Sequence, residues 1–334
     1  MATPPTLPDM SLPVPASCHP AIDQIECDAQ DWMANRIPSD AAARLAKTRA
    51  GRIAARTTDP RAPRRLVDPY ARFLLWAFWL DDEFADELPA DSPAQAPAIA
   101  SVLDILDTGR GTGAAGQAME ATLKEISADL AAILPHSQFT RWQEQMRIWL
   151  SSLTLQNALR AAPQPPTIAV YQAVRRYTVC SYPSITLIDA TRDPRIGWAE
   201  WHDPDLAVLR RHASHVVGWH NDVFSYFTEK AYPGRFWNLP AVHAAHGLSP
   251  DQALDQAARE VVAEFEQFQT QERAIASRLT ATERCHIDSL KSWMRACHDW
   301  HLEAVDRYMG WANNGWPERH VAGSPPDPRK AGST

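Results

Sequence analysis

Helical signals dominate the middle of this chain, and clusters of Pro, Gly and Asp divide it into separate pieces. The pieces are helix-sized and rich in Ala, Leu, Gln, Glu and Arg, which are strong helix formers. No β-hairpin signal and no clean period-2 run appears. The pattern predicts an all-α fold, a single-domain helical bundle with its site in a central cavity between facing helices. The dividing clusters fall at 89–97, 108–116, 163–166, 192–195 and 233–234.

Length and composition bound the function. The 334 residues suffice for one large helical domain. We expect a disordered Pro-rich N-terminus over 1–18, the folded domain over 19–315 and a flexible tail over 316–334. With a net charge of −7, the chain does not have the excess of basic residues that is typical of proteins that bind nucleic acid. No signal peptide and no apolar run of membrane-spanning length occurs, and the five scattered cysteines fit reduced thiols. These features predict a cytoplasmic protein without stable membrane insertion; a homodimer remains open.

The most informative stretch is Asn221–Glu229, which places an amide, a hydroxyl and a carboxylate four residues apart. On an α-helix, Asn221, Ser225 and Glu229 would form one stripe about 12 Å long. All three are hard oxygen ligands of the kind that Mg²⁺ prefers. A solvated surface face is the alternative. The apolar residues around the stripe favour a buried helix, in which polar groups need partners.

A second candidate metal wall lies upstream, where a strongly apolar helix runs into five carboxylates within residues 81–87. Asp82 and Asp86 would be an i,i+4 pair, with Asp81 directly before them. Like charges near a helix C-terminus repel one another and oppose the macrodipole, so the arrangement suggests a cation. An ordinary acidic helix end before Pro89 is the alternative. No phosphate-binding loop or dinucleotide fingerprint competes.

Together these motifs resemble those of the bacterial class I terpene synthase (terpene cyclase) family. Asp81-Asp82-x-x-x-Asp86, preceded by Phe78, resembles that family's aspartate-rich motif, and Asn221, Ser225 and Glu229 match its second metal motif. Upstream, Arg175 sits at the spacing of the diphosphate-sensing arginine. Near the C-terminus, Arg307-Tyr308 matches a pair that contacts the diphosphate. The resemblance covers roughly residues 19–312.

The resemblance implies an isoprenyl diphosphate substrate held by three Mg²⁺ ions, which Mn²⁺ can replace. Arginine suits the diphosphate because its planar fork binds phosphate oxygens in pairs. The alternative for Arg307 is a surface ion pair with Glu303 or Asp306. By spacing, Thr178 and Val179 would be the helix-break residues after the sensor, with Pro183 supporting the break.

The sequence departs from the family pattern at three places. Thr228 stands where a lysine often precedes the glutamate, and Lys230 follows instead as the candidate cationic contact. Ala77 occupies a position where relatives often carry an aromatic. His301 lies where relatives often have Trp or Phe, with Trp300 beside it. These departures predict an altered cavity shape.

The resemblance implies that loss of the diphosphate starts a carbocation cyclisation in a dry pocket. An aromatic face stabilises a cation by about 0.5–2 kcal/mol. Phe78 is the leading aromatic; Trp300 and His301 are further candidates for the lining, and core packing is favoured for Phe73 and Trp76. Farnesyl diphosphate, giving a sesquiterpene, is the first expectation. Geranylgeranyl diphosphate is the runner-up, because Ala77 and Val179 could enlarge the cavity.

Two other classes of protein compete. A prenyl-chain elongase would need a second aspartate-rich motif, which this chain lacks. A non-cyclising helical protein that only binds a prenyl diphosphate would not need the intact metal and arginine motifs.

Overall fold

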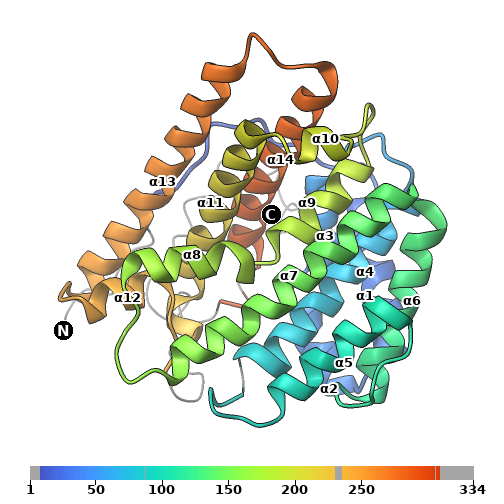
Figure 1. The fold of residues 1–334 in the computed structure, drawn as a ribbon, viewed down its shortest axis with the longest axis horizontal. Helices are drawn as coiled ribbons and strands as arrows, with labels where there is room; N and C mark the ends of the chain where they lie inside the picture. Colours follow the sequence, from blue (N-terminus) through green and yellow to red (C-terminus); the bar gives the residue numbers. More distant parts are fainter. Residues whose placement is uncertain (1–7, 87, 230–234, 305, 309–334) are drawn as a thin grey trace, which may run out of the picture.

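A computed structural model describes residues 8–86, 88–229, 235–304 and 306–308. These residues form an all-α bundle without a β-strand, which confirms the predicted fold class (Figure 1). Among them, no helix is both long and apolar enough to cross a membrane. The helices are α1 Ile22–Ala34, α2 Ser39–Ala46, α3 Ala50–Thr57, α4 Arg64–Asp81, α5 Gln95–Thr108, α6 Gln117–Ile133, α7 His136–Ala161, α8 Ile168–Thr178, α9 Ser181–Ala190, α10 Trp198–Trp201, α11 Pro204–Glu229, α12 Leu239–Ala245, α13 Pro250–Ile275 and α14 Ala281–Glu303.

The helices that carry the motifs pack against one another and against the short helices α3 and α9. Helix α4 packs on α3 and α9, α14 packs on α3, α9 and α11, and α7 packs on α8 and α9. In Figure 1, α13 lies at one edge of the molecule and α6 at the opposite edge. Most of α4 is buried, because apolar side chains surround it on nearly every face. The helices that carry the sequence motifs therefore lie inside the bundle.

Helix α4 ends in an unexpected way at the aspartate-rich motif. The α-helix stops at Asp81, and Asp82–Asp86 form a π-helix. The expected i,i+4 spacing of Asp82 and Asp86 on one α-helix is therefore wrong. A π-turn closes i→i+5 hydrogen bonds instead, and such turns occur frequently at functional sites. The backbone from Asp82 onward therefore does not continue the α-helical register of α4.

The predicted break after the sensor arginine is present. Helix α8 ends at Thr178, Val179 and Cys180 connect the two helices, and α9 begins at Ser181. Cys180 takes the left-handed conformation with φ 58°, which is uncommon for a residue with a side chain. Because Pro183 has no N–H, it cannot donate the helical hydrogen bond to the Val179 carbonyl. The chain therefore turns here, next to the cavity described below.

The N-terminal segment differs from the expectation. Residues 8–18 form no helix, but Met10, Leu12 and Val14 are buried in the hydrophobic core. Arg295 of α14 donates a hydrogen bond of 2.6 Å to the Val14 carbonyl. The expectation of disorder up to residue 18 is thus corrected for this part, because burial of three apolar side chains offsets the entropy of ordering it. Residues 1–7 and the expected tail at 316–334 lie outside the described residues.

Candidate active site

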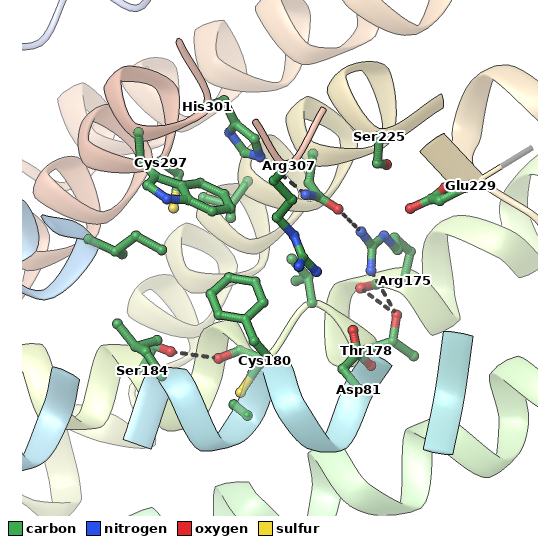
Figure 2. Close-up of a pocket in the computed structure, with 18 of the residues that line it drawn as sticks. Asp81, Arg175, Thr178, Cys180, Ser184, Ser225, Glu229, Cys297, His301 and Arg307 are labelled. Carbon is green, nitrogen blue, oxygen red and sulfur yellow. Dashed lines mark hydrogen bonds between the residues drawn. The ribbon is translucent and has the colours of Figure 1, made fainter. Parts of the chain in front are cut away.

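One cavity joins all the motif-bearing helices at the centre of the bundle. The empty space of this cavity, together with the open solvent at its entrance, is about 1040 Å³. One end carries charged and polar groups and the other is lined by apolar and aromatic side chains, as a site for an amphipathic ligand requires. Figure 2 shows Ser225 and Glu229 on one side, Asp81 and Thr178 on another, and Arg175 and Arg307 between them. The expected lining by Ala77, Phe78, Trp300 and His301 is present.

The wall from α11 carries the Asn221, Ser225 and Glu229 side chains, all of which line the cavity. Ser225 and Glu229 are buried, so the alternative of a solvated face does not hold. Among the described residues, the Ser225 hydroxyl has no hydrogen-bond partner. The Glu229 carboxylate accepts a hydrogen bond of 2.6 Å from Asn238 Nδ2, which orients it. The three oxygen groups thus face one space, one of them without a partner.

The opposite wall, at the end of α4, divides the aspartates between two environments. Asp81 lines the cavity, whereas Asp82 forms an ion pair with Arg307 at 2.8 Å between Oδ1 and Nη2. The two surface partners considered for Arg307 pair with other arginines, Glu303 with Arg56 and Asp306 with Arg49. The side chain of Asp86 and the whole of Lys230 lie outside the described residues, as do their predicted roles.

Arg175 is held from two sides at the end of α8. Its Nε donates to Asp222 Oδ1 at 2.8 Å, and its Nη2 donates to Asn221 Oδ1 at 2.7 Å. The Tyr171 hydroxyl donates to the same Asp222 carboxylate at 2.6 Å, and the Leu239 N–H donates to it at 3.1 Å. Burial alone would lower the pKa of Arg175, but the Asp222 charge raises it. The guanidinium therefore remains charged beside the cavity.

The helix-break residues lie where the resemblance implied. Thr178, Val179 and Cys180 all line the cavity. The indole of Trp149, on α7, donates a hydrogen bond of 3.2 Å to the Thr178 carbonyl. In addition, Arg175 Nη1 donates to the Thr178 hydroxyl at 3.3 Å. The break is therefore coupled to the sensor arginine on one side and to the aromatic wall on the other.

Aromatic faces form much of the apolar part. Phe78 packs against Trp300 with ring centroids 5.6 Å apart, and the Arg307 guanidinium lies 4.9 Å above the Phe78 ring. Trp149, Trp237 and Trp293 also line the cavity and were not singled out from the sequence. Trp76 is fully buried and does not line the cavity. The preference for core packing at Phe73 and Trp76 is confirmed.

Two cavity carboxyl groups have pKa values near neutrality. Burial, followed by the negative charge of Asp82, raises the pKa of Asp81 to about 7. Burial, followed by the charge of Asp222, raises the pKa of Glu229 to about 7. Removing water destabilises the ionised carboxylates, and a neighbouring charge of the same sign adds to this effect. A cation bound between the two walls would therefore stabilise the ionised form of both carboxyl groups.

The donor set fits Mg²⁺. The Asn221 amide oxygen, the Ser225 hydroxyl and the Glu229 and Asp81 carboxylates are hard oxygen ligands. The Ser225 hydroxyl without a protein partner and the two carboxyl groups with raised pKa values are what such a site would show before an ion binds. One amide, one hydroxyl and isolated carboxylates bind weakly alone, so ligand oxygens would complete the coordination.

Three residues that matter here were not predicted from the sequence. Asp222 gathers three donors, Asn238 orients Glu229, and Arg160 of α7 ties two loops together. The Arg160 guanidinium donates to the carbonyl of Ala85 within the aspartate-rich motif and to that of Leu88 just after it. It also donates to the carbonyl of Arg235 after the second metal motif. Of the three, Asp222 was the easiest to predict from the sequence. It follows Asn221 on a helix that was expected to be buried, and a buried acid needs a partner.

The central cavity of this all-α bundle combines oxygen ligands, two arginines and an apolar pocket. These features define a class of enzyme whose substrate has an anionic group and an apolar chain. Comparison with known proteins agrees. Residues 72–267, more than half of the chain, match the family model described as terpene synthase family 2, C-terminal metal binding.

Relatives extend this match along the chain. It is 33% identical over 305 residues to a (+)-corvol ether B/(+)-corvol ether A synthase of Kitasatospora setae, covering 90% of this chain and 95% of the relative. It is 26% identical over 245 residues to a 4-epi-cubebol synthase of Streptosporangium roseum, covering 72% and 73%. The fold is similar to 2-methylisoborneol synthase of Streptomyces coelicolor, with a TM-score of 0.80, 18% identity and coverage of 92% and 97%. The chain belongs to the bacterial class I terpene synthase family, whose enzymes are carbon–oxygen lyases acting on phosphates.

Proposed function

We propose that this protein is a Mg²⁺-dependent cyclase that ionises farnesyl diphosphate and closes the carbocation to a sesquiterpene, releasing diphosphate. The observation that carries the proposal is the meeting of Asp81, Asn221, Ser225 and Glu229 in one cavity that also has a large apolar and aromatic lining. Both relatives described above are named as cyclising (2E,6E)-farnesyl diphosphate, which supports this substrate.

The protein residues divide the work between the two ends of the cavity. Asn221, Ser225, Glu229 and Asp81 would hold Mg²⁺, which as a Lewis acid withdraws charge from the leaving diphosphate. Arg175 would bind the same group through its planar fork. Arg307 and Tyr308, which also line the cavity, would add further donors. The polar end thus binds and orients the diphosphate before the carbon–oxygen bond breaks.

The apolar end would control the carbocation. Phe78, Trp149 and Trp300 present aromatic faces, each of which stabilises a cation by about 0.5–2 kcal/mol. The same side chains exclude water, which would quench the cation before ring closure. The carbonyls near Thr178 and Val179 add partial negative charge at the boundary between the two ends. No side chain need be a dedicated base, because the released diphosphate can take a proton.

Geranylgeranyl diphosphate is the second candidate substrate. Ala77 and Val179, both smaller than an aromatic residue, line the cavity. Their small side chains would leave room for a longer chain. The site would serve both substrates with the same ionisation chemistry. Only the length of the apolar end would decide between a sesquiterpene and a diterpene.

The direct test is incubation with geranyl, farnesyl and geranylgeranyl diphosphate plus Mg²⁺, followed by gas chromatography and mass spectrometry. We expect a cyclic C15 product from farnesyl diphosphate, and Asn221→Ala and Glu229→Ala should abolish it. Asn35→Ala, on the exposed end of α1, is the matched control and should keep full turnover. Absence of a cyclic product from every substrate, with the protein folded and binding diphosphate, would instead support a non-cyclising binding protein.

A further inference from the structure

The Asn221 amide, a proposed Mg²⁺ ligand, is held at both of its ends. Its Oδ1 accepts a hydrogen bond of 2.7 Å from Arg175 Nη2. Its Nδ2 lies 3.1 Å from the Tyr308 hydroxyl and 3.1 Å from His301 Nε2. Guanidinium nitrogens only donate, so the amide end that faces Arg175 must be the oxygen. The chemistry of the neighbours thereby assigns the orientation of the amide.

This orientation also assigns the proton of His301. Because Asn221 Nδ2 donates, His301 Nε2 must accept, and the ring hydrogen of a neutral His301 sits on Nδ1. His301 Nδ1 lies 3.1 Å from His220 Nδ1, and His220 Nε2 lies 2.9 Å from His298 Nδ1. Donors and acceptors then alternate in one direction from Asn221 through His301 and His220 to His298. Both His220 and His301 are 1% exposed, so water does not offer an alternative partner.

The His301 contact differs in kind from the Tyr308 contact. A hydroxyl rotates and can either donate or accept, so Tyr308 would tolerate both orientations of the amide. His301 also donates a hydrogen bond to the backbone carbonyl of Cys297, one turn earlier on α14. Because that carbonyl can only accept, it keeps the ring hydrogen on the nitrogen that faces away from Asn221, and a neutral His301 offers Asn221 only an acceptor. The end of the amide that faces His301 must therefore be the nitrogen.

We propose that His301 is a positioning residue that keeps the Asn221 oxygen turned toward Mg²⁺ once Arg175 turns to the diphosphate. The inference rests on the proposed function, in which Arg175 exchanges its contact with Asn221 for the substrate. At that moment the oxygen end loses its donor, and the bond from Nδ2 to His301 is what discriminates between the two orientations. A flipped amide would present N–H groups to the ion.

Two variants separate this role from simple packing. His301→Phe keeps a ring of similar size without an acceptor, and His301→Gln restores a carbonyl acceptor at similar reach. Binding of inorganic diphosphate with Mg²⁺ is measured by isothermal titration calorimetry, and turnover is followed as a function of Mg²⁺ concentration. We expect about fivefold to tenfold weaker Mg²⁺-dependent binding for the Phe variant, the effect of one lost hydrogen bond. The Gln variant should stay within about threefold of the wild type.

The results of these measurements separate the positioning role of His301 from the proposed cyclase function on which it rests. If the wild-type protein does not bind diphosphate with Mg²⁺, the proposed function and the inference are both overturned. If the wild type binds but the Phe variant binds as tightly, or the Gln variant is as weak as the Phe variant, the inference alone is overturned. Should the Phe variant not fold, His301→Leu, smaller and also without an acceptor, takes its place in the comparison.

Discussion

The Asp222 carboxylate provides the sharpest test of how this site is assembled. It is 1% exposed and accepts hydrogen bonds from Arg175 Nε, the Tyr171 hydroxyl and the Leu239 N–H. All three of these groups donate to it, one to Oδ1 and two to Oδ2. In Asp222→Asn, one oxygen becomes an NH₂ group, which in either orientation faces a donor. The charge of Arg175 is also left without its buried partner.

The magnitude follows from this burial. Removing one partner of a buried ion pair costs about 3–5 kcal/mol, because the remaining charge stays desolvated. For a chain of this size each kcal/mol lowers Tm by roughly 2 °C, so we expect Tm to fall by about 6–10 °C. Urea unfolding followed by circular dichroism at 222 nm measures the free energy directly, with linear extrapolation to water.

A matched surface pair provides the control. Asp299 accepts from Arg295 Nε at 2.9 Å, four residues apart on α14, where both side chains are partly exposed. Asp299→Asn should cost no more than about 1 kcal/mol, the range for exposed pairs. If Asp222→Asn also costs less than that, the three converging donors do not contribute as argued, and the account of how Arg175 is positioned is refuted.

Three further predictions follow from the contacts around the metal walls. The pKa of Glu229 is raised from 4.5 to about 7, so the metal-free protein should lose stability as pH rises through this window, when the buried carboxyl is forced to ionise. Urea unfolding at pH 5 and pH 8 should show a smaller loss of stability for Glu229→Gln than for the wild type. An equal loss in the two proteins would contradict the role given to Glu229. Asn238→Ala removes both the Glu229 contact and an N-cap, which should cost about 1–2 kcal/mol and lower turnover, whereas the distant N-cap variant Ser249→Ala should affect stability alone. Unchanged turnover in the first variant would show that Glu229 does not need this contact. The Arg160 guanidinium joins the segments that follow both metal walls. Arg160→Met should therefore destabilise the protein by about 3 kcal/mol and weaken Mg²⁺-dependent diphosphate binding, as measured by calorimetry. Binding as tight as that of the wild type would argue against a coupling of the two walls through Arg160.

Local spacing was enough to predict the chemistry of two segments. Asn221, Ser225 and Glu229 lie on one stripe because an α-helix brings every fourth residue to nearly the same face, whatever packs around it. The break after Thr178 was predictable for a similar reason, since Pro183 lacks the N–H that a continuous helix would need. Both features depend only on residues close together in the chain.

Contacts between distant segments could not be predicted in this way. The pairing of Asp82 with Arg307 joins the end of α4 to the region after α14, and it removes from the cavity a carboxylate that the motif alone assigned to metal. The π-helix at Asp82–Asp86 was not predicted, and Arg160, a residue of α7, donates to the Ala85 carbonyl within it. Buried charges seek whichever partner the packed bundle brings near, because the low-polarity interior penalises each one left alone.

The sequence by itself therefore determined the helical class and the residue types on each wall of the cavity, since helix formation and ligand chemistry are local properties. Only the tertiary structure decided how these residues are held. It brought Asp222 to Arg175, Asn238 to Glu229 and His301 to Asn221, contacts that require three-dimensional packing of separate elements. The orientation of the Asn221 amide is the clearest example: its donors and acceptors are fixed by residues from α8 and α14, which no pattern along α11 could reveal.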